Sequence, residues 1–467
     1  MSQSSLKFGT SGLRGLAIEL QGQAARRYVV AFLRHLQAHG ALGGGRIYLG
    51  RDYRASSPAI LADCAAAIAS FGLEAVDCGA LPTPALALHA MAAGCGAVMV
   101  TGSHIPPDRN GLKFYLPSGE ISKDDEAGIV AALGDGVVPD SELAVADEAG
   151  PAAERYFGRM ATLLPANALK GLRIGVFEHS SVARDLLVRV MQHYGAQTIS
   201  LGRQDSFVAV DTEAFGDAVL APLAGWVASE RLDALVSADG DGDRPLLMDR
   251  KGAFVRGDVL GLLAAQYLGA RTVVTPVTSN SAIERTGYFT EVVRTKVGSP
   301  FMVAAMEAAG QGVIGFEANG GTLVGEGIGA NGVALPALPT RDAVLPLLAT
   351  LGLAAQQGKA VDDIVAALPL QIALADRLQD VPADKSSTFL SRLSDDDAFV
   401  QALFAPHGVA SVSRTDGLQF RTASGDMVHF RASGNAPELR CYVEGSSPAV
   451  AQSLLDWAMG IAAAEVR

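Results

Sequence analysis

Cysteine, positive charge and long apolar runs are all scarce in this sequence. It has 467 residues but only four cysteines, which lack metal-ligand spacing and suggest a reducing compartment: Cys64, Cys78, Cys95 and Cys441. A net charge of −12 argues against a nucleic-acid partner and gives no reason to expect a membrane surface. No apolar run is long enough to cross a bilayer, and residues 1–7 lack the apolar centre of a signal peptide. We therefore expect a cytoplasmic protein, as a monomer or a dimer.

Hydrophobic residues make up 49% of the chain, which is enough for several cores, and the length is typical of about three or four domains. Strand-like and helix-like segments alternate up to residue 369, which predicts α/β domains whose parallel sheets are covered by helices. Beyond that point, four strand-like segments and one helix indicate an α+β domain. The acidic stretch 134–151 is interpreted as the end of the first domain and a linker. The predicted domains are 1–150, 151–254, 255–369 and 370–467.

The most informative stretch is an apolar run followed by small and special residues, 97–114. The run is short enough for a buried strand, and Gly102 lets the backbone approach a ligand closely. Two prolines then prevent a helix, and Asn110-Gly111 is typical of a turn. We therefore expect Ser103 on a stiff loop, close to two charged or titratable side chains, His104 and Lys113. An ordinary polar connection between strands is the alternative.

Three aspartates alternate with glycines directly after a predicted strand, 234–237. Glycines allow tight turning, so Asp239, Asp241 and Asp243 can converge on one cation, which would offset the repulsion between their carboxylates. The EF-hand alternative fails, because its sixth and twelfth positions should be Gly and Glu but are Arg244 and Arg250. A solvated acidic turn remains the other interpretation.

Two further loops contain groups suited to a sugar phosphate. Glu317 and Asn319 follow a predicted strand, and residues two apart in an extended chain share a face, so both side chains can point at sugar hydroxyls. The loop 431–440 combines an arginine and a hydroxyl with backbone N–H groups around a glycine, which makes an anion nest. Its expected phosphate contacts are Arg431, Ser433, Gly434 and Asn435. The alternative for the loop with Glu317 and Asn319 is an ordinary turn at the end of a strand, and the alternative for 431–440 is a plain hairpin loop.

Together these motifs resemble the signatures of the α-D-phosphohexomutases. The stretch 101–113 matches the pattern Thr-(Ala/Gly)-Ser-His-x-Pro followed by Asn-Gly-x-Lys, and 239–244 matches Asp-Gly-Asp-(Gly/Ala)-Asp-Arg. Residues 7–15 are similar to the N-terminal signature, and 431–440 to Arg-Pro-Ser-Gly-Thr-Glu-Pro-x-Leu-Arg. Some positions depart from the family. Asn319 and Gly321 stand where Ser and His are usual, and Ser299 stands where the family often has His after Lys-Thr-Gly.

The resemblance implies three α/β domains with mixed sheets plus a C-terminal α+β domain around a central active-site cleft. It also implies an intramolecular phosphotransferase that interconverts hexose 1-phosphate and hexose 6-phosphate through a phosphoserine and a hexose 1,6-bisphosphate, which would serve as activator too. The sugar is expected to be mannose and also glucose, because the Glu-Ala-Asn-Gly-Gly loop is most similar to that of bacterial phosphomannomutases. Phosphoglucosamine mutase and a non-catalytic sugar-phosphate-binding regulator are the alternatives.

Individual residues receive roles from the same resemblance. Ser103 would carry the phosphoryl group, and Lys113 or His104 would act as general acid/base. Arg14 would line the cleft and Arg244 would face the transferring phosphoryl group, and both, with the metal, are expected to lower the pKa of Lys113. One Mg²⁺ per chain would be bound by Ser103, Asp239, Asp241 and Asp243. The substrate would be bound by Glu317, Asn319, Lys296, Arg431, Ser433, Gly434 and Asn435.

Overall fold

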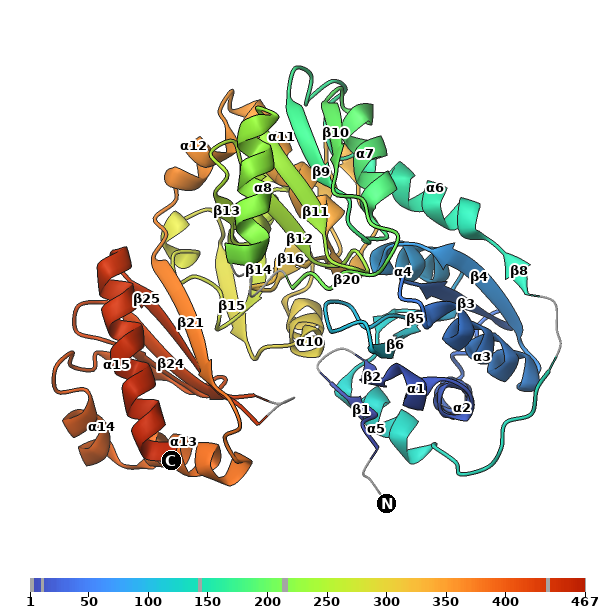
Figure 1. The fold of residues 1–467 in the computed structure, drawn as a ribbon, viewed down its shortest axis with the longest axis horizontal. Coiled ribbons are helices and arrows are strands. Elements are labelled where there is room, and N and C mark those ends of the chain that lie inside the picture. The colour runs from blue at the N-terminus through green and yellow to red at the C-terminus, as the bar shows by residue number, and fades with distance from the viewer. Residues whose placement is uncertain (1–3, 10–11, 142–144, 212–216, 434–436, 467) are drawn as a thin grey trace.

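The structure, a computed structural model, describes residues 4–9, 12–141, 145–211, 217–433 and 437–466. Three α/β units and a C-terminal α+β unit follow one another along the chain (Figure 1). The first unit and the C-terminal unit lie on opposite sides, and the second and third units lie between them (Figure 1). Among the described residues, no helix is long and apolar enough to cross a membrane.

The first unit is an eight-stranded mixed sheet with helices on both faces. Its main strand order is β1-β2-β6-β5-β3-β4-β8, and β7 pairs with β6. The strands are β1 (Lys7–Phe8), β2 (Leu13–Leu16), β3 (Arg46–Arg51), β4 (Glu74–Ala80), β5 (Gly96–Val100), β6 (Arg109–Leu116), β7 (Gly119–Glu120) and β8 (Ala146–Asp147). The helices are α1 (Ala17–Leu20), α2 (Gln23–Ala38), α3 (Ser57–Ser70), α4 (Thr83–Ala92) and α5 (Lys123–Ala131). Helices α2, α3 and α5 pack together, whereas α4 faces the other units.

The second unit is a five-stranded sheet in the order β10-β9-β11-β12-β13. Its strands are β9 (Arg173–Phe177), β10 (Gln197–Leu201), β11 (Ala234–Ala238), β12 (Pro245–Asp249) and β13 (Phe254–Val255). Its helices are α6 (Ala149–Met160), which also packs against α4, then α7 (Arg184–His193) and α8 (Asp217–Ser229).

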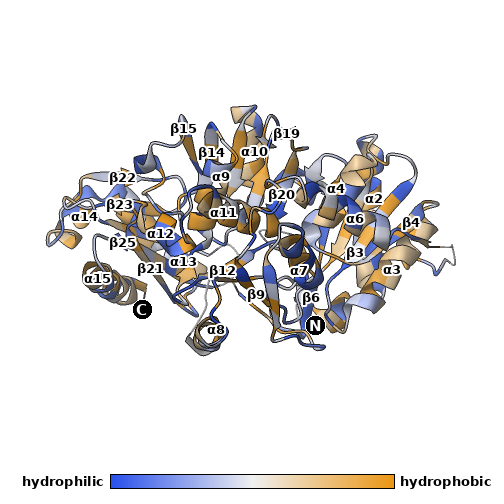
Figure 2. Cartoon of the chain, turned by 90° about the horizontal axis from the view of Figure 1, so that it is seen from above, coloured by the Kyte–Doolittle hydropathy of each residue, from blue (hydrophilic) through white to orange (hydrophobic). Residues whose placement is uncertain are grey.

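The third unit is a five-stranded sheet in the order β15-β14-β16-β17-β20, with a separate hairpin, β18-β19. Its strands are β14 (Thr272–Pro276), β15 (Glu291–Thr295), β16 (Val313–Phe316), β17 (Thr322–Val324), β18 (Gly329–Ala330), β19 (Val333–Ala334) and β20 (Leu338–Asp342). Its helices are α9 (Gly257–Tyr267), the 3₁₀ turn η1 (Glu284–Thr286), α10 (Ser299–Ala309), α11 (Val344–Gln356) and α12 (Val361–Ala366). Residues Val344 to Ala354 of α11 are all buried, as expected for a helix that is apolar all round, and Figure 2 shows α11 in the middle of the molecule.

The same five-strand arrangement occurs in all three α/β units. In each unit three neighbouring strands pair in parallel, and two more strands follow, each antiparallel to the strand before it. The orders are β4-β3-β5-β6-β2, β10-β9-β11-β12-β13 and β15-β14-β16-β17-β20. The reversal follows β5, β11 or β16, where parallel pairing changes to antiparallel. The loops at these reversals contain Ser103, Asp239 and Glu317 respectively. The repeated topology therefore places one candidate site loop at the equivalent position of each unit.

The C-terminal unit is an antiparallel sheet in the order β21-β25-β24-β23-β22. Its strands are β21 (Ile372–Leu378), β22 (Ser411–Ser413), β23 (Leu418–Arg421), β24 (Met427–Ala432) and β25 (Leu439–Gly445), and its helices are α13 (Ala383–Asp395), α14 (Asp397–Leu403) and α15 (Pro448–Val466). It has a core of its own, which contains four buried phenylalanines: Phe389, Phe404, Phe420 and Phe430. One continuous core runs instead through the first three units.

Several expectations about local structure were wrong. Asn110-Gly111 is not a turn but lies inside β6, where Gly111 pairs with Arg14 and Asn110 is buried. The stretch 134–151 is not only a linker, because β8 joins the first sheet beside β4 and α6 already begins at Ala149. The alternation of strands and helices predicted parallel sheets in the α/β units. The sheets are mixed, which is what the family resemblance implied. Strand β21 and helices α13 and α14 were not predicted from the sequence.

Candidate active site

The loop after β5 holds Ser103 in an unusual backbone conformation. Its φ is 50°, in the left-handed region that residues with a side chain rarely adopt, and it is 1% exposed. Its N–H donates to Thr101 Oγ1 (2.8 Å), and its Oγ donates to Asp239 Oδ2 (2.7 Å). Such a conformation persists only where the surrounding structure holds it. The hydroxyl is therefore presented at a defined place beside the aspartates of the second unit.

The group that holds this loop is Arg54, which the sequence reading missed. Its side chain is buried and donates to four backbone carbonyls of the loop, those of Ser103 (2.8 Å), Ile105 (2.6 Å), Pro106 (2.6 Å) and Arg109 (3.0 Å). Its charge is paired with Asp52, whose carboxylate also accepts from Thr101 Oγ1. The only available signal was the Arg-Asp-Tyr-Arg string, 51–54, at the end of the β3 strand beside β5.

A close approach at Gly102 is made by Arg54. A Cβ atom on Gly102 would lie 2.7 Å from Arg54 Cζ and 2.8 Å from Arg54 Nε. The glycine thus makes room for the guanidinium that fixes the loop.

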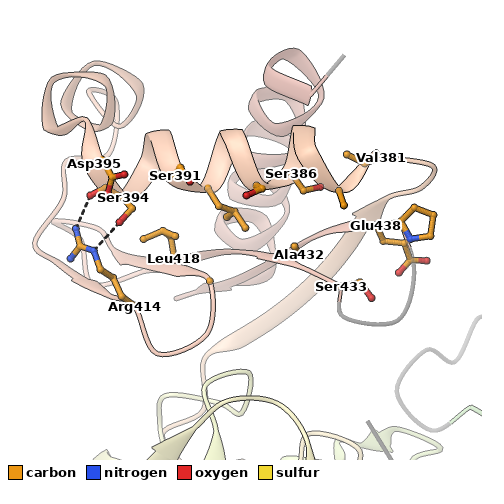
Figure 3. Close-up of a pocket in the computed structure, with 15 residues that line it drawn as sticks. Val381, Ser386, Ser391, Ser394, Asp395, Arg414, Leu418, Ala432, Ser433 and Glu438 are labelled. Carbon is orange, nitrogen blue, oxygen red and sulfur yellow. Dashed lines mark hydrogen bonds between the residues drawn. The ribbon is translucent and has the colours of Figure 1, made fainter. Parts of the chain in front are cut away.

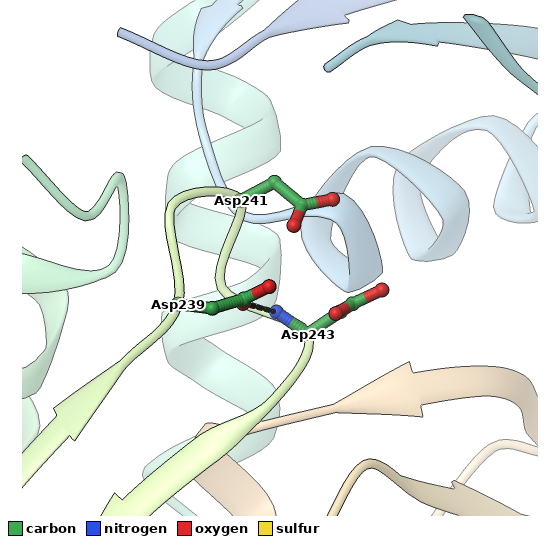
Figure 4. Close-up of side chains that lie close together, drawn as sticks. All are labelled: Asp239, Asp241 and Asp243. Carbon is green, nitrogen blue, oxygen red and sulfur yellow. Dashed lines mark hydrogen bonds between the residues drawn. The ribbon is translucent and has the colours of Figure 1, made fainter. Parts of the chain in front are cut away.

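Three aspartates meet in the turn between β11 and β12 (Figure 4). One oxygen from each of Asp239, Asp241 and Asp243 lies within 4.8 Å of the others, and all three residues are buried. Gly242, with φ 70°, allows the tight turn. Asp241 Oδ1 and Asp243 Oδ1 are buried without a hydrogen-bond partner in the described part of the chain. Unused buried carboxylate oxygens are costly unless a cation takes them, so this donor set fits Mg²⁺.

Lys113, on β6, donates to Asp241 Oδ2 and Asp243 Oδ2, both at 2.6 Å. Burial lowers the pKa of Lys113, but the two aspartates outweigh it, so the net pKa is raised. Arg14, Arg244 and the metal together were expected to lower this pKa; among the protein groups alone, the aspartates prevail over the groups that lower it. Lys113 is a charged partner of the two aspartates.

The aspartates differ among themselves in proton affinity. Burial and the neighbouring Asp241 and Asp243 raise the pKa of Asp239 well above its usual value. Burial acts in the same direction on Asp243, but Arg341 and Lys113 prevail and hold its pKa below the usual value. Of these two carboxylates, Asp239 is thus the one whose charge the surrounding protein groups compensate less.

His104 and two arginines complete the centre. Burial, followed by Arg244 and Arg14, lowers the pKa of His104 to about 2, so the imidazole is neutral. Its Nδ1 lies 3.3 Å from Ser103 Oγ. Burial, then Arg244 and Arg341, lowers the pKa of Arg14 to about 10, and Arg244 Nε lies 3.8 Å from Asp243 Oδ1. The structure thus brings these sequence-predicted residues of the first two units together.

The loop after β16 turns sharply instead of continuing as a strand. Glu317 N–H donates to Gly321 O, and Asn319 Nδ2 donates to Glu317 Oε2 (3.2 Å). The two side chains meet as expected, although a turn and not a shared strand face brings them together. A second residue that the sequence reading missed, Arg341 on β20, donates to Glu317 Oε2 (3.0 Å) and to Asp243 Oδ2 (3.0 Å).

Arg431, one of the predicted phosphate contacts, lies at the junction of the third and C-terminal units. Asp416 Oδ2 accepts from Arg431 Nε (2.6 Å) and from the N–H of Val297 (3.0 Å), next to the exposed Lys296. Ser433 lines a pocket of 540 Å³ between α13 and the sheet (Figure 3). Gly434 and Asn435 lie outside the described residues.

Family models for phosphoglucomutase/phosphomannomutase match most of the chain. The models of the alpha/beta/alpha domains I, II and III match residues 5–136, 154–252 and 256–371. The chain belongs to the α-D-phosphohexomutase family. It is an enzyme of the isomerase class that moves a phosphoryl group within a hexose phosphate.

Relatives of this phosphohexomutase match over nearly its full length. The phosphomannomutase of Sinorhizobium fredii (strain NBRC 101917 / NGR234) is 47% identical over 468 residues, which cover 98% of each chain. That of Salmonella muenchen is 41% identical over 452 residues, covering 96% of this chain and 93% of the relative. A phosphoglucosamine mutase of Rhodococcus jostii (strain RHA1) is 29% identical over 473 residues, covering 98% and 99%. The solved phosphoglucomutase/phosphomannomutase family protein of Burkholderia thailandensis has the same fold, with a TM-score of 0.79 at 20% identity over 98% of each chain.

Proposed function

We propose that this phosphohexomutase interconverts mannose 1-phosphate and mannose 6-phosphate, accepts glucose phosphates as well, and carries the phosphoryl group on Ser103. The observation that carries the proposal is the 2.7 Å hydrogen bond from Ser103 Oγ to Asp239, inside a buried group of three aspartates. Mannose is favoured because the relatives at 47% and 41% identity are phosphomannomutases, whereas the phosphoglucosamine mutase of Rhodococcus jostii is 29% identical.

In the proposed reaction, phosphoryl transfer depends on positioning and charge neutralisation. One Mg²⁺ per chain, held by oxygens of Asp239, Asp241, Asp243 and Ser103, would supply charge neutralisation at the transferring group. Arg244 and Arg14 would add positive charge near the aspartates. The phosphate on Ser103 passes to one sugar oxygen, the hexose 1,6-bisphosphate turns around, and its other phosphate returns to Ser103. The free bisphosphate would act as activator by phosphorylating Ser103.

Two side chains, Lys113 and His104, are assigned to proton transfer by their position. His104 Nδ1 lies 3.3 Å from Ser103 Oγ, but a pKa lowered to about 2 makes the neutral imidazole a weak base. Lys113 carries a proton that it can donate, but the aspartates that raise its pKa also make it a weaker acid. We therefore assign the general acid/base to this pair and not to one of its members.

The sugar and its second phosphate would be held by the other two units. Glu317 and Asn319 are assigned to sugar hydroxyls, and Lys296 to the rim of the site. The loop with Arg431 and Ser433, together with Gly434 and Asn435, is assigned to the phosphate remote from Ser103. Because the bisphosphate must bind in two orientations, tight recognition of one sugar edge is disfavoured.

We further propose a cytoplasmic enzyme, as a monomer or a dimer. Its four cysteines are buried and free, which is consistent with a reducing compartment.

The deciding experiment is turnover of mannose, glucose and glucosamine 1-phosphates by the purified protein. We expect mannose and glucose 1-phosphate to be converted with kcat/KM values within roughly a hundredfold, because the pair differs in one hydroxyl orientation. Glucosamine 1-phosphate as the best substrate would establish phosphoglucosamine mutase instead. Binding of the sugar phosphates without turnover of any would establish the non-catalytic regulator.

A further inference from the structure

Arg341 is the least expected charged residue of the centre, because nothing in its own sequence surroundings marks it. It lies on β20, is 3% exposed, and contacts two loops from different units. Its Nη1 donates to Glu317 Oε2 (3.0 Å), while its Nε (3.1 Å) and Nη2 (3.0 Å) both donate to Asp243 Oδ2. One planar guanidinium therefore fixes a carboxylate of the sugar loop relative to a carboxylate of the metal loop.

The stem of Arg341 occupies the space beside Gly321. A Cβ atom on Gly321 would lie 2.6 Å from Arg341 Cδ, 2.7 Å from Cγ and 2.8 Å from Cβ, and no real Cβ tolerates such distances. Gly321 is not among the residues with positive φ, so the constraint at this position is space and not backbone conformation. Gly321 stands where the family pattern has histidine. An arginine from the neighbouring strand thus fills room that a side chain on the loop would need.

Charge also ties Arg341 to Glu317. Glu317 is 5% exposed, and its Oε2 accepts from Arg341 and from Asn319. A buried carboxylate without a charged partner is strongly disfavoured. Without Arg341, Glu317 would lose its charged partner at a buried place and turn toward water, so its position against the sugar would change.

We infer that Arg341 is a positioning residue for the mutase reaction, which sets the orientation of Glu317 relative to the metal loop, and that Gly321 is required to leave room for it. The inference rests on the proposed function of Glu317 as a reader of sugar hydroxyls. Arg341 then acts through Glu317 and affects both mannose and glucose phosphates, which share the hydroxyls assigned to that carboxylate.

The first test is a double-mutant cycle with Arg341→Met and Glu317→Gln. Each single variant should lower kcat/KM for mannose 1-phosphate about 10- to 100-fold. The double variant should lose no more than about threefold beyond the worse single one, because both changes remove the same contact. Arg341→Lys should remain within about threefold of Arg341→Met, since an ammonium does not offer two fixed donors. Arg250→Met, at an ion pair with Asp362 outside the site, is the matched control and should be unaffected.

Binding measured without turnover separates this inference from the proposed function. In a Ser103→Ala background, titration calorimetry with mannose 1-phosphate should show about tenfold weaker binding when Arg341→Met is added. Losses that multiply in the double variant, or an Arg341→Met effect confined to the Mg²⁺ dependence, would overturn the role through Glu317. Absence of turnover in the wild type would refute the mutase assignment alone, because the binding comparison stands independently.

Gly321 provides a second test that uses stability and not activity. Gly321→Ala should lower the thermal unfolding midpoint and reproduce the kinetic defect of Arg341→Met, because the added methyl displaces the arginine stem. In an Arg341→Gly background the same substitution should have little further effect on either quantity, since Cβ, Cγ and Cδ of Arg341 are then all absent. Equal losses from Gly321→Ala in both backgrounds would show that Gly321 does not serve Arg341.

Discussion

Arg54 is the buried support of the phosphoserine loop, and Arg54→Met tests that role directly. The substitution keeps the length of the apolar stem but removes the guanidinium, which makes hydrogen bonds to four loop carbonyls and to Asp52. Both side chains of the Arg54–Asp52 pair are fully buried. The variant therefore leaves Asp52 as an unpaired buried carboxylate and the loop carbonyls without their donor.

The magnitude follows from this burial. Removing one partner of a buried ion pair costs about 3–5 kcal/mol, and because the loop carbonyls lose their donor too, we expect a value in that range. Arg54 also donates a hydrogen bond to the carbonyl of Ser103 and so supports the left-handed backbone of that serine. Loss of that support should lower kcat, because a small displacement of the nucleophile has a large effect on transfer.

Hydrogen exchange of a peptide that covers 97–114 is the appropriate assay, since unfolding of a chain with several domains need not be two-state. A cost of about 3 kcal/mol corresponds to roughly a hundredfold faster exchange. Arg250→Met, which removes a half-exposed arginine, should change stability by less than about 1 kcal/mol. Asp52→Asn in the Arg54→Met background should recover part of the loss. Unchanged exchange of the loop in Arg54→Met would refute the reasoning.

Three further predictions concern the chemistry and the pH dependence of stability. Ser103→Ala should abolish turnover while circular dichroism shows that the fold is intact. Intact-mass spectrometry should find a phosphate on part of the wild-type protein. Near-normal activity of the variant would contradict the role of Ser103 as phosphoryl carrier. Chelation with EDTA should abolish activity and Mg²⁺ should restore it; an unchanged rate would refute the metal site. Burial lowers the pKa of His179 to about 4, so the unfolded state binds more protons between pH 4 and 6.5, and stability should rise with pH there by about 3 kcal/mol. His179→Asn should flatten this rise, measured as the hydrogen-exchange protection of a peptide that covers 172–182 after correction for the intrinsic exchange rate. The same slope in both proteins would refute it.

Much of the candidate site could be predicted because its parts are local strings. Ser103, the three aspartates and Glu317 each follow a buried strand, and the glycines around them indicate tight turns. These features depend on neighbours a few residues away, so they are visible in the sequence. The alternation of strands and helices in the first three units was recognisable for the same reason, because apolar periodicity is a local property.

Other local signals were misleading because long-range pairing overrode them. Asn110-Gly111 has turn chemistry, but β6 continues through it and pairs with β2, while the Asn110 amide donates to Ser57 Oγ (3.0 Å). Gly102 was interpreted as room for the approach of a ligand, and Gly321 only as a departure from the family pattern. The structure shows that each lies against an arginine from another strand or loop, which no local pattern encodes.

The sequence by itself therefore determined which loops carry chemistry, since the residue types that hold a cation or a phosphoryl group must lie close together in the chain to share one turn. Only the tertiary structure decided how these loops act on one another. Arg54 and Arg341 lie 49 and 98 residues away from the partners they fix, Ser103 and Asp243. The pKa of Lys113 is likewise set by aspartates of another unit. The physical reason is that hydrogen bonds and charge pairing depend on distance in space, which folding sets and sequence separation does not.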